Sequence, residues 1–389
     1  MLYNAAEYKK IRVNFINKES LGTNMFKITS EEGNARAGVL ELNGRKTETP
    51  FFMPVVTKGA AKFINNKELK QIGSDAIICN GFILSIKPGL NVLRKMGGIH
   101  KFINYDGVVF TDSGGFQMYS DKLLEKTTKE GIHFKEPFHG SKLLITPEKD
   151  MEMQNTIGSD VAMCLDDMPV YGSDKERIKE SVLKTIDWAK RCKEHHDKIK
   201  DKQWLFGIIQ GGTHPDLREF CARAIAAMDF DGYAFGGLAI GEPPEETFAA
   251  VEAAINFVPK EKPRYLMGVG TPGLILEAVS MGVDCFDSRY PTMTARNGTM
   301  FTWKGQINID KKEFEFDSEP IDPECRCFTC KNFTKAYLHH LTRLNEPTGH
   351  TLKTIHNVSW MQEFMRRIRE SIKEGKFEEF KKKFLEKFT

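Results

Sequence analysis

The chain alternates between short apolar runs and longer segments in which apolar residues recur every three or four positions. Runs rich in apolar and β-branched residues predict strands, and the longer period predicts amphipathic helices. Eight such runs occur, at Met53–Thr57, Asp75–Asn80, Gly107–Asp112, Val161–Asp167, Leu205–Gly211, Tyr233–Gly237, Arg264–Gly270 and Val283–Asp287. Helical patterns lie between most of them, at Asn65–Gln71, Pro88–Lys95, Pro147–Ile157, Asp174–His195, Asp216–Met228, Glu245–Phe257 and Pro272–Ser280.

Alternation of strands and helices predicts parallel strands, and eight of them predict a closed (β/α)8 TIM barrel of the α/β class. An open, doubly wound sheet is the alternative. Within residues 1–50, polar turns on either side of Ala37–Leu42 predict an N-terminal antiparallel sheet. We assign the barrel and the C-terminal helices to residues 51–298 and 357–389. The segments 113–146 and 299–356 break the rhythm, and we interpret both as insertions, the second holding a metal.

The composition describes a large globular protein. The 389 residues include 40% hydrophobic residues, and 56 Lys and Arg against 53 Asp and Glu give a net charge of +3. This balance excludes a disordered chain and neither requires nor excludes a nucleic-acid partner. No window offers the ~20 apolar residues of a membrane span and no basic-then-apolar leader opens the chain, so we expect a cytoplasmic protein with no membrane partner. The basic segment from about Met365 to Lys387 is typical of a solvated helix face, and phosphate contacts are the alternative.

The eight cysteines fall into two groups. Five are scattered, mostly in apolar runs, and are typical of buried thiols in a reducing compartment. Cys325, Cys327 and Cys330 lie within six residues, a spacing that suits one metal ion better than disulfides. Tetrahedral zinc needs a fourth ligand, for which the spacing leaves four candidates open: His339, His340, His350 and His356. We expect one structural Zn²⁺, because no open coordination position is indicated.

Polar residues gather where the predicted strands end, which is where barrel enzymes place their active sites. Six of the eight strand ends carry them: Asp112-Ser113-Gly114, Asp166-Asp167, Gln210-Gly211-Gly212, Gly236-Gly237-Leu238, Gly268-Val269-Gly270 and Asp287-Ser288. A single Asp of this kind is as often the N-cap of the next helix, and paired glycines usually serve turns. The chain has no phosphate-binding Gly-x-x-x-x-Gly-Lys loop and no serine nucleophile elbow.

The residue types at these ends favour chemistry on a nucleoside. Carboxylates and a Gln amide suit the donor-rich edge of a guanine-like base, and glycine N–H groups suit its carbonyl oxygen. A buried Asp can attack an anomeric carbon and hold a covalent glycosyl intermediate while a second carboxylate moves protons. The pattern therefore indicates an enzyme that binds a purine and attacks its sugar.

Five motifs, in order over nearly the whole chain, resemble the tRNA-guanine transglycosylases. They are Thr111–Gln117, Gln210–Gly212, Gly236–Glu242, Tyr265–Gly270, and the cysteine cluster with His356-Asn357. This family of glycosyltransferases exchanges guanine at wobble position 34 of the tRNAs for Asp, Asn, His and Tyr for a 7-deazaguanine, in queuosine modification. The resemblance implies a homodimer, with the metal insertion near its interface, and no nucleotide or redox cofactor.

The resemblance also implies roles for individual residues. Asp287 is the expected nucleophile at C1′ of the ribose, and Asp112 the expected general acid and base. The expected base-binding residues are Ser113, Gly114, Gly115, Phe116, Asp166, Gln210, Gly236, Gly237, Leu238, Glu242 and Met267. The expected tRNA-binding residues are Gly268, Val269, Gly270, Thr271, Pro272, Gly273, Leu274, Arg289, Thr292, Met293, Thr294, Ala295 and Arg296. The expected zinc ligands are Cys325, Cys327, Cys330 and His356.

Some positions depart from the bacterial pattern. Leu165–Met168 is closer to the eukaryotic sequence, whereas Gly237–Gly241 and Arg296–Gly298 look bacterial, and Met293 stands where bacterial relatives usually carry arginine. These differences leave both preQ1 and queuine open as the incoming base. Two rival functions are a non-catalytic RNA-binding subunit on the same barrel and an archaeal-type D-loop transglycosylase. The presence of Asp112 and Asp287 argues against the first, and the archaeal type usually carries further C-terminal domains.

Overall fold

The computed structural model describes residues 24–114, 124–135 and 140–388. Its centre is a ring of eight parallel strands in the order β4-β14-β13-β12-β11-β10-β6-β5. Their bounds are β4 Phe51–Pro54, β5 Ala76–Asn80, β6 Val108–Asp112, β10 Val161–Met163, β11 Trp204–Ile209, β12 Gly232–Phe235, β13 Arg264–Leu266 and β14 Cys285–Ser288. A parallel bridge between Val55 and Ile78 joins the first strand to β5, with Val56 N–H donating to Ile78 O at 2.8 Å. The predicted closed barrel is confirmed, and the open sheet is excluded.

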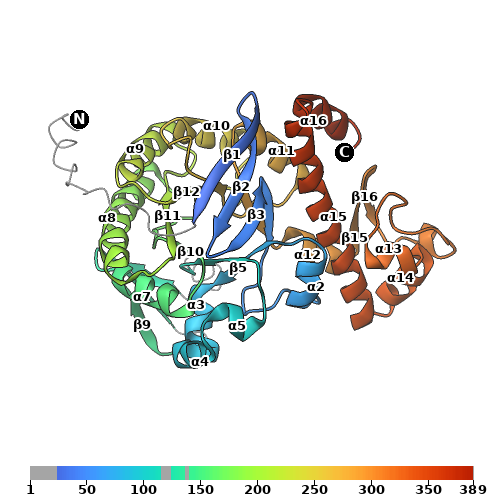
Figure 1. Cartoon of the computed structure of the whole chain (residues 1–389), viewed down its shortest axis with the longest axis horizontal. Helices are drawn as coiled ribbons and strands as arrows, with labels where there is room; N and C mark the ends of the chain where they lie inside the picture. Colours follow the sequence, from blue (N-terminus) through green and yellow to red (C-terminus); the bar gives the residue numbers. More distant parts are fainter. Residues whose placement is uncertain (1–23, 115–123, 136–139, 389) are drawn as a thin grey trace.

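Helices surround the barrel (Figure 1). Those between strands are α2 Asn66–Gln71, α3 Gly81–Leu84, α4 Leu90–Met96, α5 Ile99–Ile103, α7 Pro147–Ile157, α8 Lys175–Ile199, α9 Pro215–Ala226, α10 Pro244–Ile255 and α11 Pro272–Ser280. All seven predicted helical segments are found. The cap of α2 is a reciprocal one, in which Asn65 accepts from Glu68 N–H and the Glu68 carboxylate accepts from Asn65 N–H. The second segment starts two residues late, at Leu90, because Gly89 has φ +96° and ψ 148°, outside the helical region.

One strand is shorter than predicted. The sequence predicts a strand over Val161–Asp167, but β10 ends at Met163. Beyond it, Cys164 N–H still donates to Phe206 O at 3.0 Å, whereas the backbone of Asp167 turns toward α8. There Asp167 N–H donates to the hydroxyl oxygen of Thr185 at 3.1 Å, and the Ser181 hydroxyl donates to Asp167 O. The helix therefore takes over the hydrogen bonds that a neighbouring strand would have supplied.

The predicted N-terminal antiparallel sheet is present as β1 Met25–Glu32, β2 Ala35–Leu42 and β3 Arg45–Thr49. It lies across the N-terminal face of the barrel (Figure 1), since Leu40 and Leu42 join the apolar cluster that fills the barrel interior. Arg36 on β2 donates through Nε to Asp284, at the start of β14, at 2.9 Å. This face is therefore closed by packing and by a buried ion pair, which leaves the opposite face for ligands.

Both predicted insertions have secondary structure of their own. The first contains a three-stranded antiparallel sheet, β7 Leu124–Thr127, β8 Ile132–Lys135 and β9 Lys142–Ile145. The second contains the hairpin β15 Thr299–Thr302 and β16 Gly305–Asn308, the 3₁₀ turn η2 Lys312–Phe314, and the helices α13 Phe328–Asn332 and α14 Lys335–Arg343. Helix α15, Pro347–Lys373, runs through the expected boundary at residue 356 and packs against both the insertion and β4.

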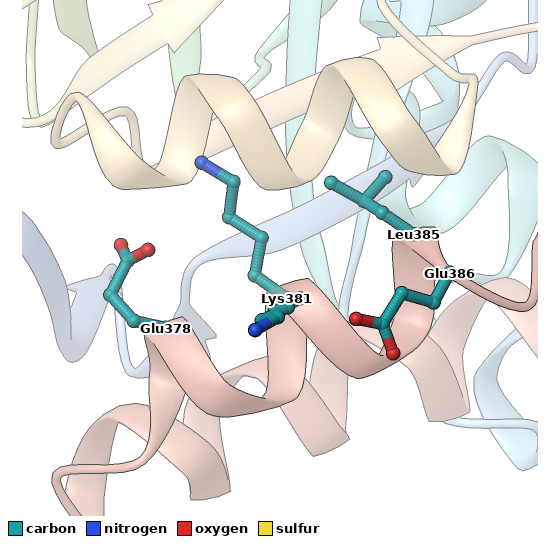
Figure 2. A pocket seen from close by; sticks show the side chains of 5 residues that line it. Glu378, Lys381, Leu385 and Glu386 are labelled. Carbon is teal, nitrogen blue, oxygen red and sulfur yellow. The ribbon is translucent and has the colours of Figure 1, made fainter.

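The basic C-terminal segment is folded against the barrel. Helix α16, Phe377–Leu385, buries Phe377 and Phe384, and the Phe384 ring lies 6.2 Å from that of Trp360 on α15. Figure 2 shows Lys381 pointing toward α11, where its Nζ lies 2.6 Å from a Glu277 carboxylate oxygen. A shallow pocket of about 460 Å³ lies beside these side chains. No helix in the described ranges is long and apolar enough to cross a membrane.

Candidate active site

Asp287 lies at the C-terminal end of β14 and accepts two hydrogen bonds on the same oxygen. The Tyr265 hydroxyl donates to its Oδ1 at 2.5 Å, and Gly268 N–H donates to Oδ1 at 2.8 Å. Burial raises the pKa of Asp287, and these two neutral donors oppose the rise. Among the described residues no donor contacts Oδ2, so one carboxylate oxygen is oriented and the other is available to react.

Asp112 lies at the end of β6, where it shares the C-terminal face of the barrel with Asp287. Gly114 N–H donates to its Oδ1 at 2.9 Å. Burial, followed by the negative charge of Asp287, raises the pKa of Asp112 to about 8. A carboxyl group with this pKa holds a proton at neutral pH and can release it nearby, as a general acid and base requires.

A third carboxyl group, Asp166, lies beside Gln210. The Gln210 side chain donates from Nε2 to Asp166 Oδ2 at 2.6 Å, and both residues are buried. Burial raises the pKa of Asp166 to about 6, against the lowering effect of the Gln210 hydrogen bond. The pair offers an amide and a carboxyl group side by side, which matches the mixed donors and acceptors on the edge of a purine.

The loop after β12 packs its glycines against Gln210. Gly237 has φ +64°, and a Cβ there would lie 2.3 Å from Gln210 Oε1, so only glycine fits. The neighbouring Leu238 is buried, and the side chain of Glu242 folds back to accept hydrogen bonds from Ala239 N–H and Ile240 N–H. Met267 is half-buried after β13. Ser113 and Gly114 are buried, whereas Gly115 and Phe116 lie outside the described residues.

The residues expected to contact tRNA form two stretches beside Asp287. The first stretch runs from the loop Gly268 to Thr271 into the first turn of α11, Pro272 to Leu274. In the second, Arg289 comes just before α12, Tyr290–Arg296, and Thr292 to Arg296 lie within that helix. Arg289 is exposed, whereas Met293 and Arg296 are half-buried. The hydroxyls of Thr292 and Thr294 donate to backbone carbonyls of their own helix, at 3.0 Å and 2.8 Å. These two threonines therefore stabilise the local backbone.

Two contacts in the site have no counterpart in the roles expected from the sequence. Tyr265 lies inside the barrel and orients Asp287, although its position in a strand core predicts only packing. Asp167, next to Asp166, binds Arg177 through two hydrogen bonds of 2.8 and 2.9 Å, and Lys184 Nζ lies 3.3 Å away. No signal in the sequence marks Arg177 or Lys184, because charged residues on a surface helix are ordinary.

Cys325, Cys327, Cys330 and His356 lie together, with their ligand atoms within 4.8 Å of one another. His356 Nδ1 is 3.2 Å from Cys330 Sγ and 3.6 Å from Cys327 Sγ. Its Nε2 lies 2.7 Å from the carbonyl oxygen of Phe301, which fixes Nδ1 as the free nitrogen. Three thiolates and one imidazole form a donor set that fits a tetrahedral metal ion, so this group can hold one.

Comparisons with known proteins agree with this geometry. The family model described as queuine tRNA-ribosyltransferase matches residues 31–389. The chain is 45% identical over 355 residues to the queuine tRNA-ribosyltransferase of Thermoanaerobacter pseudethanolicus, covering 91% of this chain and 94% of that protein. It is 44% identical over 360 residues to the protein of the same name from Francisella tularensis subsp. novicida, covering 92% and 98%. It is 43% identical over 360 residues to that of Staphylococcus aureus, covering 92% and 95%.

Proposed function

This chain belongs to the queuine tRNA-ribosyltransferase family, and we propose that it exchanges guanine at wobble position 34 of the tRNAs for Asp, Asn, His and Tyr for a 7-deazaguanine. The observation that carries the proposal is that the carboxyl groups of Asp287 and Asp112 interact electrostatically at the C-terminal face of the barrel, where the Asp166–Gln210 pair also lies. A nucleophile, a proton carrier and a purine-reading pair thus meet at one end of the barrel. The similarity extends over nearly the whole chain and supports the same activity.

The reaction uses two displacements at one carbon. The free oxygen of Asp287 attacks C1′ of the ribose, the bond from C1′ to N9 of guanine breaks, and guanine leaves with the electron pair and takes the proton of Asp112. The result is an ester between Asp287 and the tRNA. The incoming base then gives its N9 proton to Asp112 and attacks C1′, which releases Asp287. One glycosidic bond replaces a similar one, so the step needs no ATP and no redox cofactor.

The recognition roles follow the positions of the other residues. Asp166, Gln210, Gly236 and Gly237 bind the edge of the base, with Ser113, Gly114 and Leu238 beside it and Met267 over the ring. The stretches Gly268–Leu274 and Thr292–Arg296, together with Arg289, hold the anticodon loop, which is single-stranded and so yields a base at low cost. We assign the metal to a structural Zn²⁺ bound by Cys325, Cys327, Cys330 and His356, which fixes the second insertion to α15.

We also propose a homodimer. Three aromatic rings of the second insertion contact one another in a row. The centroids of Phe328 and Phe333 are 5.9 Å apart in an edge-on arrangement, and those of Phe333 and Tyr337 are 5.4 Å apart and stacked. Phe328 is 56% exposed and Tyr337 41% exposed, so these rings offer an apolar patch that a second copy of the chain can cover. Light scattering of the purified protein tests this assembly, and a monomer at micromolar concentration would contradict it.

Base exchange tests the main proposal. Transfer RNA for Tyr or Asp is loaded with radiolabelled guanine and chased separately with preQ1 and with queuine. We expect release of label by one of these bases, together with an enzyme–tRNA adduct that survives a denaturing gel. The base that releases label identifies the natural substrate. If neither base releases label and guanine self-exchange is also absent, the proposed function is wrong.

A further inference from the structure

Arg218, on α9, is a buried arginine that contacts the two loops behind the base-reading residues. Its side chain is 0% exposed. Its guanidinium donates from Nη1 to Ile209 O at 2.8 Å, from Nε to Gly212 O at 2.7 Å, and from Nη2 to Gly237 O at 3.5 Å. Ile209 is the last residue of β11 and Gly212 lies in the loop that follows it, whereas Gly237 lies in the loop after β12. One planar group thus joins two loops that come from neighbouring strands.

Gln210 lies between the two carbonyls of its own loop that Arg218 holds. Its backbone N–H donates to Cys221 Sγ, also on α9, at 3.3 Å. A Cβ on Gly211 would lie 2.7 Å from the backbone nitrogen of Arg218, so the loop sits tightly on the helix. On the other side, the Gln210 side chain lies against Gly236 and Gly237. The orientation of the Gln210 amide therefore depends on the distance between the two loops.

The positive charge of Arg218 is not balanced by a carboxylate in the described part of the chain. Within the described ranges no carboxylate forms an ion pair with it, and Glu242, which acts on it electrostatically, accepts its hydrogen bonds from Ala239, Ile240 and Thr247. Burial lowers the pKa of Arg218 to about 10, so the group stays charged at neutral pH. Burying a cation without a carboxylate partner costs stability. What arginine supplies in return is a rigid fork of donors that reaches three carbonyls at once.

We propose that Arg218 is a positioning residue for the base: by joining the carbonyls of Ile209, Gly212 and Gly237, it sets the spacing at which Gln210, Gly236 and Gly237 read the purine. It does not touch the reacting atoms. The inference rests on the proposed function for the identity of the ligand, and on the hydrogen bonds alone for the joining of the loops. It predicts that the affinity for the free base depends on Arg218, whereas the affinity for tRNA, held mainly by other loops, does not.

The test compares Arg218→Met with Arg223→Met. Both arginines lie on α9, but Arg223 is exposed, pairs with Glu219 and stacks on Phe257, away from the loops. Steady-state exchange gives KM for the incoming 7-deazaguanine and KM for tRNA separately. We expect Arg218→Met to raise KM for the base by roughly tenfold and KM for tRNA by less than about twofold, since loss of well-placed hydrogen bonds affects the ligand that they bind. We expect Arg223→Met to change neither.

A second readout does not require activity. Hydrogen–deuterium exchange of the peptides spanning residues 207–214 and 234–241 reports whether the two loops are held, and we expect faster exchange in Arg218→Met. If Arg218→Met does not fold, Arg218→Lys, which keeps the charge but not the fork, takes its place with the same expected shifts. Unchanged loop exchange or an unchanged KM for the base in a folded variant overturns the inference. If the wild-type protein exchanges no base, the proposed function fails, while loop exchange still decides whether Arg218 joins the loops.

Discussion

Four carboxylates near the ends of two strands differ in the groups that bind them. Asp284 and Asp160 come just before β14 and β10, whereas Asp287 lies in β14 and Asp166 lies three residues beyond β10. At the N-terminal face, Asp284 binds Arg36, and Asp160 lies 3.0 Å from His100 and 3.1 Å from Arg45. At the C-terminal face, Asp287 and Asp166 accept hydrogen bonds only from neutral groups within the described part of the chain. At the C-terminal face, then, the carboxylates at the base-reading and reacting positions have neutral donors, whereas Asp167, which turns away toward α8, is bound by Arg177 and Lys184.

These contacts act on the pKa values, although burial still raises the pKa of Asp284 against the lowering effect of Arg36. Burial alone would raise the pKa of Asp160, but the hydrogen bond and charge of His100, with further donors from Asn43 and Val109 N–H, lower it overall. Asp166 and Asp112 contact no such cation among the residues that the structure describes, and their pKa values rise to about 6 and about 8. A carboxylate that is paired with a cation stabilises the fold, whereas one held by neutral donors can change its proton or form a bond near neutral pH.

The largest expected effect comes from Asp287→Asn. The amide keeps an oxygen for Tyr265 and Gly268 but cannot form the ester, so we expect exchange to fall by at least about 10³-fold and the tRNA adduct to disappear. Because burial raises the pKa of Asp287, ionised Asp287 opposes folding at neutral pH. The variant should therefore melt at the same temperature or higher. A clear fall in melting temperature would contradict the contrast between the two faces.

The matched change on the same strand is Asp284→Asn. It leaves the buried guanidinium of Arg36 without its carboxylate, and breaking such a pair costs about 3–5 kcal/mol of unfolding free energy. Urea denaturation measures this loss. We expect the exchange rate per folded molecule to stay near that of the wild type, since Asp284 lies at the opposite face from the reacting residues. A large loss of kcat in the folded fraction would show that the two faces are coupled.

The barrel was predictable from the sequence because each of its strands and helices produces a short-range pattern of apolar and polar residues. Eight apolar runs, each followed by a helical period with its own cap, are enough to order the strands. The end of β10 was not predictable, since it depends on hydrogen bonds from Thr185 and Ser181, about twenty residues further along a helix. Likewise, four histidines remained open from spacing alone, and the resemblance pointed to His356. The structure places it beside the cysteines because α15 carries it past β15.

In the site, the sequence predicted the polar residues at the strand ends but not the residues that orient them. Asp112, Asp166, Gln210 and Asp287 stand out because polar residues directly after buried strands are conspicuous. Tyr265 and Arg218 do not stand out, because a tyrosine in a strand and an arginine in a helix are ordinary residues until their partners are known. The orientation of a site side chain depends on contacts with elements far away in the sequence, and a local sequence pattern does not predict these contacts.

The pH dependence of exchange tests the role of the raised pKa at Asp112. In the proposed mechanism, protonated Asp112 gives its proton to the departing guanine, so kcat/KM for tRNA should fall about tenfold per pH unit above pH 8, where the group loses its proton. The pKa of Asp112 in the folded chain is above its ordinary value of 3.8, so the stability that this group contributes is lost as pH rises from about 4 toward 8. The melting temperature of Asp112→Asn should accordingly exceed that of the wild type increasingly over this range. A rate that keeps rising through pH 9 would exclude Asp112 as the acid.

The smallest expected effect comes from Tyr265→Phe, which removes one neutral donor from Asp287 and leaves Gly268 N–H in place. Loss of a hydrogen bond to a carboxylate costs about 1.5–3 kcal/mol, so kcat should fall by roughly ten- to a hundredfold while KM for the base stays unchanged. Because the hydroxyl lowers the pKa of Asp287, its removal should also shift the acidic limb of the pH–rate profile to higher pH. Tyr233→Phe is the control, since Tyr233 is an equally buried barrel tyrosine whose hydroxyl donates to Ala226 O instead. If both variants lose activity equally and neither shifts the profile, Tyr265 contributes packing alone, and the neutral donors of the C-terminal face do not tune the nucleophile.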